Sequence, residues 1–295
     1  MSKQKITLVI PCFNEQESLP IFYKEISKVL HSMECDYELI FIDDGSNDDT
    51  LKLLRKFGEN DKNLKYVSFS RNFGKEAAIY AGLQNAGGNY AAIMDVDLQD
   101  PPSLLLDMYR ILKEEPYDSV ATRRSTRMGE PKIRSFLSKE FYNVINKISK
   151  TEIVSGARDY RLMNRKMIDA VLEMSEYNRF SKGIFGWVGF RTKWLEYENV
   201  ERAKGETKWN FWKLFLYSLD GITAFSTVPL AISSVTGRYR ASIPSLRSCS
   251  TALPATPSRR SSISCASSPW HVMTHPSIRI SLADLQFSQV TISRR

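Results

Sequence analysis

Two acidic residues separated by one position follow a short apolar run near the middle of the chain. Asp95 and Asp97 come directly after Tyr90–Met94, and a pair of prolines follows at positions 101 and 102. Carboxylates spaced in this way beyond a strand can turn toward one cation, and their hard oxygen atoms suit Mg²⁺ or Mn²⁺, which also binds substrate phosphates. A solvated acidic turn would show the same spacing. The strand and the double proline favour a site for a metal and a diphosphate.

Polar residues also follow two earlier apolar runs. Asp43–Ser46 comes after Tyr37–Ile42, and Pro11–Glu15 comes after Ile6–Ile10. A carboxylate at such a strand end can accept hydrogen bonds from a base or a ribose, although the same residues also suit a helix N-cap with a tight glycine turn. The segment Ser70–Lys75 places basic groups at the start of a predicted helix, where the helix dipole disfavours them. A nucleotide phosphate or a surface salt bridge would explain them.

The elements that must position these groups alternate along the chain from Met1 to Val235. Short apolar runs alternate with segments of helical spacing, which predicts an α/β domain with a mostly parallel sheet. The predicted elements are strands at Ile6–Ile10, Tyr37–Ile42, Leu64–Phe69 and Tyr90–Met94, and helices at Glu17–Leu30, from Asp48 or Asp49 to Phe57, and at Lys75–Ala86. Open α/β sheets bind ligands beyond the carboxyl ends of their strands. Three of the predicted strands end in polar groups at that place.

The net charge of +8 lies almost entirely in the segment that follows Val235. From Thr236 to Arg295 the chain has eight arginines, no lysine and one acid, so the part from Met1 to Val235 carries 33 bases and 32 acids. A nearly neutral main domain without a recognition motif argues against nucleic-acid binding. Four cysteines without a CxxC pair and only three histidines argue against a zinc site.

The C-terminal segment differs in composition from the rest of the chain. From Thr236 onward it holds fourteen serines and shows no sustained period of 2 or 3.6, which predicts a disordered or poorly folded tail. A natural basic tail and a C-terminus replaced through a shifted reading frame both fit. The abrupt loss of lysine favours the second explanation.

Six motifs occur in a fixed order over about residues 5–232. They are PCFNE, DDGSNDDT, RNFGKEAA, MDVDLQDPP, ARDYRLMNR and RAKGETKWN. Together they resemble the inverting GT-A glycosyltransferases of family 2, in particular the polyprenyl-phosphate branch with the bactoprenol glucosyltransferases and dolichol-phosphate mannose synthases. The resemblance implies a GT-A fold, a Rossmann-like nucleotide-diphospho-sugar transferase domain.

The resemblance also implies roles for individual residues. Matching positions give a nucleotide-sugar site at Pro11, Glu15, Asp44 and Asp95, and the basic segment adds Lys75 to it. They give a metal site for Mg²⁺ or Mn²⁺ at Asp95, Asp97 and Gln99. They also give the catalytic or acceptor-positioning residues Asp159, Arg202 and Lys208. The implied reaction transfers a hexose, glucose above all, from UDP-glucose or a GDP-mannose type of donor to undecaprenyl phosphate with inversion. Transfer to a saccharide hydroxyl and an inactive, truncated nucleotide-binding module stay open as alternatives.

The chemistry of the acceptor decides whether the reaction needs an acid–base residue. A phosphate monoester has its second pKa near 6, so a polyprenyl phosphate is already an anion at neutral pH and needs positioning more than deprotonation. Five bases between residues 123 and 134 predict a mobile acceptor loop in which Arg123, Arg127 and Arg134 bind that phosphate. A solvated basic surface is the alternative.

The predicted domains are a catalytic domain at 1–208, an amphipathic juxtamembrane segment at 209–232, and the tail at 233–295 in place of transmembrane helices. Apolar stripes at 133–148 and 209–219 suit either a bilayer interface or the domain core. No window of 18 apolar residues exists, so we expect a protein peripheral to the cytoplasmic face of the membrane, whereas full-length relatives are integral. The resemblance leaves a homo-oligomer open.

Overall fold

The computed structural model describes residues 4–124, 154, 156–176, 179–197, 234 and 290–293. The chain divides into one compact unit of Met1–Ser226 with Ser277–Arg295 and a second of Thr227–Pro276, of which only Ser234 is described. All that follows concerns the first unit. Arg127, Arg134, Arg202, Lys208 and the two apolar stripes lie outside the described residues.

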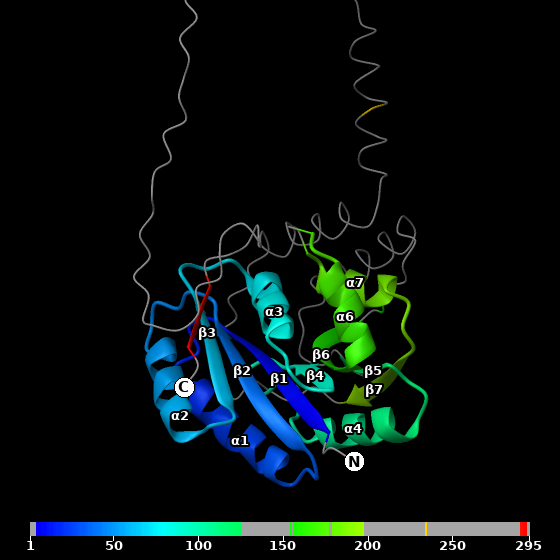
Figure 1. Cartoon of the computed structure of the whole chain (residues 1–295), viewed down its shortest axis with the longest axis horizontal. Coiled ribbons are helices and arrows are strands. Elements are labelled where there is room, and N and C mark those ends of the chain that lie inside the picture. Colours follow the sequence, from blue (N-terminus) through cyan, green and yellow to red (C-terminus); the bar gives the residue numbers. More distant parts are fainter. Residues whose placement is uncertain are drawn as a thin grey trace, which may run out of the picture. The chain divides into compact units, whose positions relative to one another are not determined.

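One sheet organises the described part of the chain (Figure 1). Its strands are β1 (Lys5–Cys12), β2 (Asp36–Asp43), β3 (Leu64–Phe69), β4 (Tyr90–Ile93), β5 (Ser119–Arg124), β6 (Ala157–Asn164), β7 (Thr192–Tyr197) and β8 (Val290–Ser293). They are hydrogen-bonded in the order β7-β5-β6-β4-β1-β2-β3-β8.

The strand directions confirm the predicted mostly parallel sheet. Parallel pairs join β1 to β2 and β4, β2 to β3, and β5 to β7. In contrast, β6 runs antiparallel to both of its neighbours, β4 and β5. The start of β6 therefore lies at the edge of the sheet where β1, β2 and β4 end.

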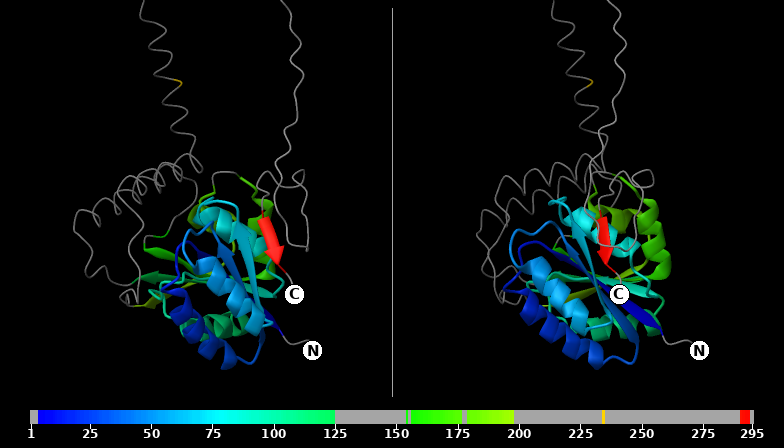
Figure 2. Two further views of the ribbon diagram at one scale, coloured as in Figure 1. Left: turned by 90° about the vertical axis from the view of Figure 1, so that its left-hand side faces the viewer. Right: turned by 60° about the vertical axis from the view of Figure 1, so that its left-hand side comes forward.

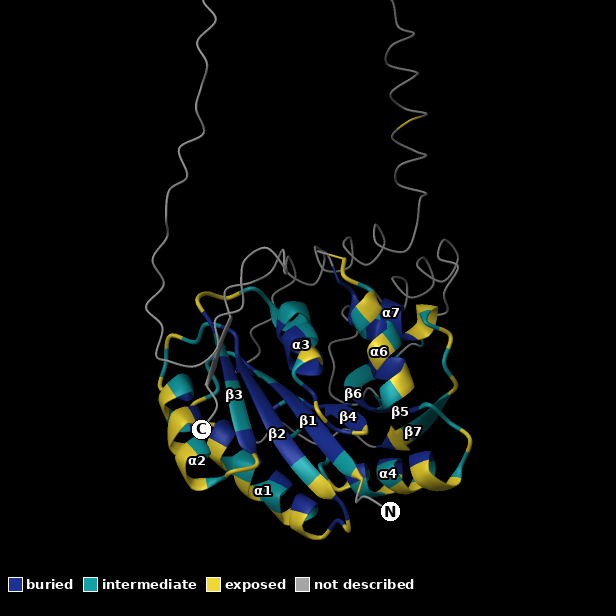
Figure 3. Ribbon diagram, in the orientation of Figure 1, coloured by how far each residue is buried: buried dark blue, intermediate teal, exposed yellow. Residues whose placement is uncertain are grey.

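Helices cover both faces of the sheet (Figure 1). They are α1 (Leu19–His31), α2 (Thr50–Asn60), α3 (Lys75–Gln84), α4 (Leu104–Glu114), α6 (Arg165–Glu173) and α7 (Ser181–Trp187). Alternate residues of each strand point to opposite faces. Leu8 and Phe41 accordingly pack with α1, α2 and α4 in one core cluster, while Val9 and Ile40 pack with α3, α6 and α7 in the other. The central strands are buried on both faces, as Figure 3 shows.

The predicted elements agree with the structure apart from their ends. The strand at Leu64–Phe69 is found with the same bounds, and β1 and β2 extend beyond their predictions at both ends. The second helix begins at Thr50, whose backbone N–H donates to Asp48 Oδ1 at 3.0 Å, whereas Asp49 makes no capping bond. Of the two predicted capping residues, Asp48 is thus the one whose side chain bonds to the N-terminus of this helix.

A short strand forms within the segment for which the sequence predicts a disordered tail. The strand β8 pairs antiparallel with β3 at the edge of the sheet (Figure 2). Its sequence VTIS is rich in β-branched residues, which fit an extended edge pairing. The domain boundaries drawn from the sequence stay a prediction. Among the described residues, no helix is long and apolar enough to cross a membrane.

A buried acid stabilises the end of the sheet where β1 begins. Glu38 is only 2% exposed and accepts four hydrogen bonds. Lys5 Nζ and Lys65 Nζ donate to Oε2 at 2.8 and 2.7 Å, and Thr7 Oγ1 and the Gly87 N–H donate to Oε1 at 2.6 and 2.7 Å. Burial alone would raise the pKa of Glu38, but these bonds outweigh it and lower the pKa to about 2 from its ordinary 4.5.

We predict that Glu38→Gln lowers the free energy of unfolding at pH 7 by about 2–4 kcal/mol, because it breaks a buried ion pair. Since the folded pKa is depressed, the charged group stabilises the fold above pH 4.5, and this contribution is lost as the pH falls toward 2. The difference between variant and wild type should therefore close over that interval. Urea unfolding followed by circular dichroism measures it.

Glu34→Gln is the matched control, because Glu34 is exposed and makes no hydrogen bond or ion pair with the described residues. It should change stability by less than about 0.5 kcal/mol. A Glu38→Gln protein as stable as wild type at pH 7 would contradict the proposed role of Glu38.

Candidate active site

The two acids that the sequence analysis considered separately meet at one edge of the sheet. Asp95 follows the end of β4, and Asp159 lies near the start of β6. Ile93 pairs with Arg161 across these antiparallel strands. Continuing this register by two residues places Asp95 opposite Asp159. Two carboxylates in such positions repel each other, so a cation is needed between them.

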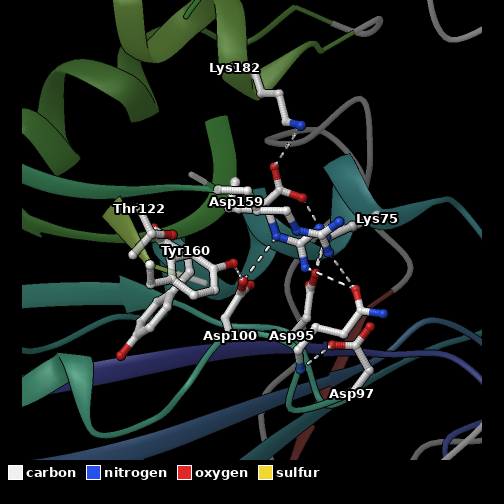
Figure 4. Close-up of polar contacts among 12 residues, drawn as sticks. Lys75, Asp95, Asp97, Asp100, Thr122, Asp159, Tyr160 and Lys182 are labelled. Atoms are coloured by element: carbon white, nitrogen blue, oxygen red, sulfur yellow. Dashed lines mark hydrogen bonds and ion pairs between the residues drawn. The ribbon is translucent and has the colours of Figure 1, made fainter. Parts of the chain in front are cut away.

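Lys75 supplies that cation. Its Nζ lies 2.7 and 2.8 Å from the two carboxylate oxygens of Asp95 and 2.5 Å from Asp159 Oδ2. Lys182 Nζ, from α7, lies 4.0 Å from Asp159 Oδ1. Figure 4 shows Lys75 reaching between the two acids, with Lys182 approaching Asp159 from the side away from Asp95. The basic residue at the start of α3 is thus explained by two carboxylates inside the site and not by a surface salt bridge.

Burial and charge act in opposite directions on these groups. Burial favours the neutral form of each, but attraction between Lys75 and the two acids outweighs it. The pKa of Lys75 is raised and the pKa of Asp159 is lowered, the latter with a further contribution from Lys182. The side chains of Asp95 and Asp159 are 25% and 21% exposed, so a ligand can still reach them.

A second ion pair lies beside the first. Arg158 Nε donates to Asp100 Oδ1 at 3.0 Å, and the Tyr197 hydroxyl donates to the same oxygen. Asp100 is 3% exposed, and burial raises its pKa although Arg158 opposes this. Arg158 and Arg124 both donate to Gln99 Oε1, at 3.3 and 2.8 Å. The residues after Asp97 therefore hold two guanidinium groups at the edge of the site.

The residues predicted to hold a metal fit it in part. Asp95 and Asp97 offer two carboxylates, and a Mg²⁺ or Mn²⁺ ion can take its other ligands from water and phosphate. Asp97 Oδ1 also accepts the Gln99 N–H at 3.2 Å, and Leu98 between them has a φ of 57°, which is uncommon for a residue other than glycine. The Gln99 side-chain oxygen already accepts two hydrogen bonds. Within the described residues, no group of three or more His, Cys, Asp and Glu could hold a metal.

The turn after β2 shapes a cavity of about 340 Å³. Its lining includes Asp43, Gly45, Ser46 and Arg71. A Cβ atom on Gly45 would lie 2.4 Å from the backbone carbon of Arg71, and its φ is +68°, so only glycine fits this turn. Such a cavity beside strand ends suits a nucleoside.

Asp44 has a structural partner that the sequence did not reveal. It is 4% exposed, and its carboxylate accepts the N–H groups of Phe73 at 2.7 Å and of Gly74 at 3.0 Å. Burial raises the pKa of Asp44 to about 6, although these bonds oppose the shift. Asp44 thus holds the loop that precedes Lys75 in place. Its contact with a nucleoside stays a prediction.

The remaining predicted site residues lie at or near the same edge. Pro11 lies near the end of β1, and Glu15 accepts a hydrogen bond from Ser18 Oγ at 2.9 Å. Arg123, at the end of β5, forms an ion pair with Glu196. Its guanidinium is thus already engaged, and its predicted contact with the acceptor stays untested.

Sequence reasoning missed the contact of Lys75 with Asp159 and the roles of Arg158 and Lys182. The antiparallel direction of β6 is set by tertiary pairing, and no local pattern signals it. The only sequence signal for a role of Arg158 was its position directly before Asp159.

The family model described as glycosyl transferase family 2 matches residues 7–172. The chain is 42% identical over 239 residues to the protein CsbB of Bacillus subtilis (strain 168), covering 81% of this chain and 72% of that protein. The chain belongs to glycosyl transferase family 2. It is therefore an enzyme, a glycosyltransferase.

Two further likenesses refine this assignment. This family 2 glycosyltransferase is 40% identical over 239 residues to the prophage bactoprenol glucosyl transferase homolog of Escherichia coli (strain K12), covering 81% of this chain and 78% of that protein. Its fold is similar to that of mannosyl-3-phosphoglycerate synthase from Rubrobacter xylanophilus, with a TM-score of 0.53, 16% identity, and coverage of 84% of this chain and 79% of that one. The predicted GT-A fold is confirmed.

We predict that Lys75→Met destabilises the glycosyltransferase by about 1–3 kcal/mol at pH 7. The substitution leaves Asp95 and Asp159 facing each other without their shared cation, and their partial exposure keeps the loss below that of a fully buried pair. Lys75→Arg should recover part of it. Urea unfolding of the three proteins tests this.

Lys52→Met is the matched control, because Lys52 pairs with Asp49 at 3.9 Å on the exposed face of α2. Exposed pairs of this kind contribute about 0.5 kcal/mol or less. If Lys75→Met unfolds at the same urea concentration as the control, Lys75 is not needed to hold the two acids together.

Proposed function

We propose that this glycosyltransferase moves glucose from UDP-glucose to a polyprenyl phosphate, with inversion at the anomeric carbon. The observation that carries the proposal is the 39–40% identity, over 239 residues each, to proteins named bactoprenol glucosyl transferase or its homolog. The charge arrangement at the sheet edge is consistent with it, because both the departing group and the entering group of this reaction are phosphates.

The state of Asp159 favours a phosphate acceptor over a hydroxyl. A hydroxyl must lose its proton during attack, which calls for a base with a pKa near the working pH. Asp159 is engaged by Lys75 at 2.5 Å and faces Lys182, so it is a weak base. A phosphate monoester needs no base, because it is already an anion.

The proposed reaction exchanges one phosphate oxygen for another. An oxygen of the acceptor phosphate forms a bond to the anomeric carbon while the bond from that carbon to the donor's diphosphate breaks on the opposite side. No proton has to move. In this scheme Lys75 and Arg158 stabilise the diphosphate as it departs, and Asp159 orients Lys75 and Lys182.

We also propose that Asp95 and Asp97 hold a Mg²⁺ or Mn²⁺ ion. Bound there, such an ion supplies positive charge to a nucleoside diphosphate. The cavity beside Gly45 and Ser46 would take the nucleoside. Because the donor is water-soluble and the acceptor's chain is lipid-soluble, the enzyme would act at a membrane surface. We propose the cytoplasmic face.

The donor can be identified by thermal unfolding in the presence of Mn²⁺. A ligand at 100 times its Kd adds about 2.7 kcal/mol of stability, which raises the Tm of a domain of this size by roughly 5–10 °C. We expect UDP-glucose to give a larger shift than GDP-mannose, and Asp97→Asn to abolish most of it.

Asp107→Asn serves as the control for that substitution, because Asp107 lies on the exposed face of α4 and its side chain is 54% exposed. Its UDP-glucose shift should equal that of wild type. A larger shift with GDP-mannose would replace the proposed donor, and an undiminished shift in Asp97→Asn would remove Asp97 from the site.

The acceptor can be identified by the pH dependence of transfer. With a short, soluble polyprenyl phosphate, kcat/KM should rise through the second pKa of the phosphate, about 6, and then level off. A phosphonate acceptor, whose second pKa is higher, should move this inflection upward. Polyprenol should accept no glucose.

The inflection is informative because it distinguishes the acceptor from the enzyme. An inflection that stays at the same pH with both acceptors would indicate a base on the enzyme. Efficient transfer to a saccharide hydroxyl in place of the polyprenyl phosphate would overturn the proposed acceptor.

A further inference from the structure

A cationic cavity lies beside Asp159, and Arg158 is the one residue that it shares with the groups proposed to bind the donor. It has a volume of about 150 Å³ and lies between β6, α7 and β7. Arg158, Arg161 and Lys182 line it together with Thr192 and aromatic rings, and none of the described residues that line it is acidic. Such a lining favours an anion.

Arg161 is the unusual member of this lining. It is 4% exposed, its Nε has no hydrogen-bond partner, and its guanidinium makes no ion pair or hydrogen bond with any described residue. Its contacts are with rings, at 4.3 Å from the centroid of Phe185 and 5.7 Å from that of Trp194. Burial lowers the pKa of Arg161 to about 9, although Asp159 opposes the shift. A buried cation with so little compensation destabilises the protein unless an anion joins it.

Two other arginines of this fold, one half-buried and one buried, have oxygen partners. Arg158 forms its ion pair with Asp100 at 3.0 Å. Arg179, which is 8% exposed, donates to the backbone carbonyls of Met174 and Val171. Among these three described arginines, burial of a guanidinium without oxygen partners is therefore particular to Arg161.

The sheet register explains how Arg161 reaches the cavity. Ala121 on β5 pairs with Arg161 on one side and with Trp194 on the other. Side chains at one register position share a face of the sheet. The small side chain of Ala121 leaves room above the middle strand, so the guanidinium can extend between Phe185 and Trp194.

The position of the cavity suits the entering group of the reaction. Lys182 both lines the cavity and approaches Asp159 from the side away from Asp95 (Figure 4). Inversion requires the nucleophile and the departing group to lie on opposite sides of the reacting carbon. An anion in this cavity and a diphosphate near Asp95 would lie on opposite sides of Asp159.

We propose that this cavity binds the phosphate of the acceptor, with Arg161 and Lys182 as its binding groups and the rings of Phe185 and Trp194 against the first carbons of the prenyl chain. The inference rests on the proposed function, because it names the acceptor subsite of that reaction. A guanidinium and an ammonium match a phosphate dianion in charge and in donors. The aromatic walls match the apolar chain attached to it.

Arg161→Met tests this subsite, with farnesyl phosphate, inorganic phosphate and farnesol as probes in thermal unfolding. Wild type should be stabilised by farnesyl phosphate, less by inorganic phosphate at equal concentration, and not by farnesol. Arg161→Met and Lys182→Met should lose most of the farnesyl phosphate shift and keep the UDP-glucose shift. In assays, kcat/KM for the acceptor should fall at least about 10-fold, as expected for one lost charged hydrogen bond.

Stability distinguishes this role from a structural one. Because Arg161 lacks compensation, the free Arg161→Met protein should be at least as stable as wild type. A fall in its Tm together with unchanged farnesyl phosphate binding would make Arg161 a structural residue and overturn the inference. Arg110→Met is the control, since Arg110 forms an exposed pair with Asp107 on α4 and should leave every probe unchanged.

The two proposals fail in different ways. If wild type responds to UDP-glucose but not to farnesyl phosphate, the acceptor is not a polyprenyl phosphate and the proposed function itself is wrong. If wild type and Arg161→Met respond equally to farnesyl phosphate, the acceptor stands and only this subsite is wrong. An equal response of wild type to inorganic and farnesyl phosphate would overturn the role of the aromatic walls.

Discussion

The ammonium group of Lys75, held between Asp95 and Asp159, is the interaction on which the site depends. The antiparallel pairing of β6 with β4 brings the two carboxylates to facing positions, where they would repel each other. Lys75 can neutralise both only because α3 begins at the same edge of the sheet, one residue after Gly74. The buried carboxylate of Asp44 holds this loop through the N–H groups of Phe73 and Gly74. One ion triad thus requires the consecutive elements α3 and β4 and the distant strand β6 to be placed correctly.

The charged groups at the two ends of the sheet differ in exposure: those at one end stabilise the fold, and those at the other end stay accessible to a ligand. Glu38, at one end, is 2% exposed and accepts four hydrogen bonds, so nothing remains for a ligand. Asp95 and Asp159, at the other end, are paired with Lys75 but keep 25% and 21% of their side-chain surface. The same attraction between opposite charges therefore fixes the fold at one end. At the other it prepares a set of charges that a phosphate ligand can join without reorganising them.

The sequence predicted the helices and strands well, but it predicted only in part which side chains the fold brings together in the site. Periodicity and turn residues located the first four strands, and the polar residues after β1, β2 and β4 correctly pointed to one edge of the sheet. No local pattern shows that β6 reverses direction, so Asp159 could be assigned to the site by resemblance but not by geometry. Arg161 lies within the motif ARDYRLMNR, but nothing in the sequence distinguishes it from Arg158 as the buried arginine. Its burial between two rings depends on Ala121 on the neighbouring strand β5, which only the register reveals.

The paired state of Asp159 bears on the kind of acceptor that such a site can serve. An acid that is to accept a proton near neutral pH must be kept from cations, since each nearby positive charge stabilises its ionised form. Here the fold does the reverse and brings Lys75 and Lys182 to its two oxygens. An acid so placed stays ionised over the whole working range, and its constant charge can hold two ammonium groups in fixed positions. An acceptor that arrives as an anion needs positively charged groups in fixed positions, and it does not need a base to remove a proton. The useful property of Asp159 in this glycosyltransferase is then its permanent negative charge rather than its affinity for a proton.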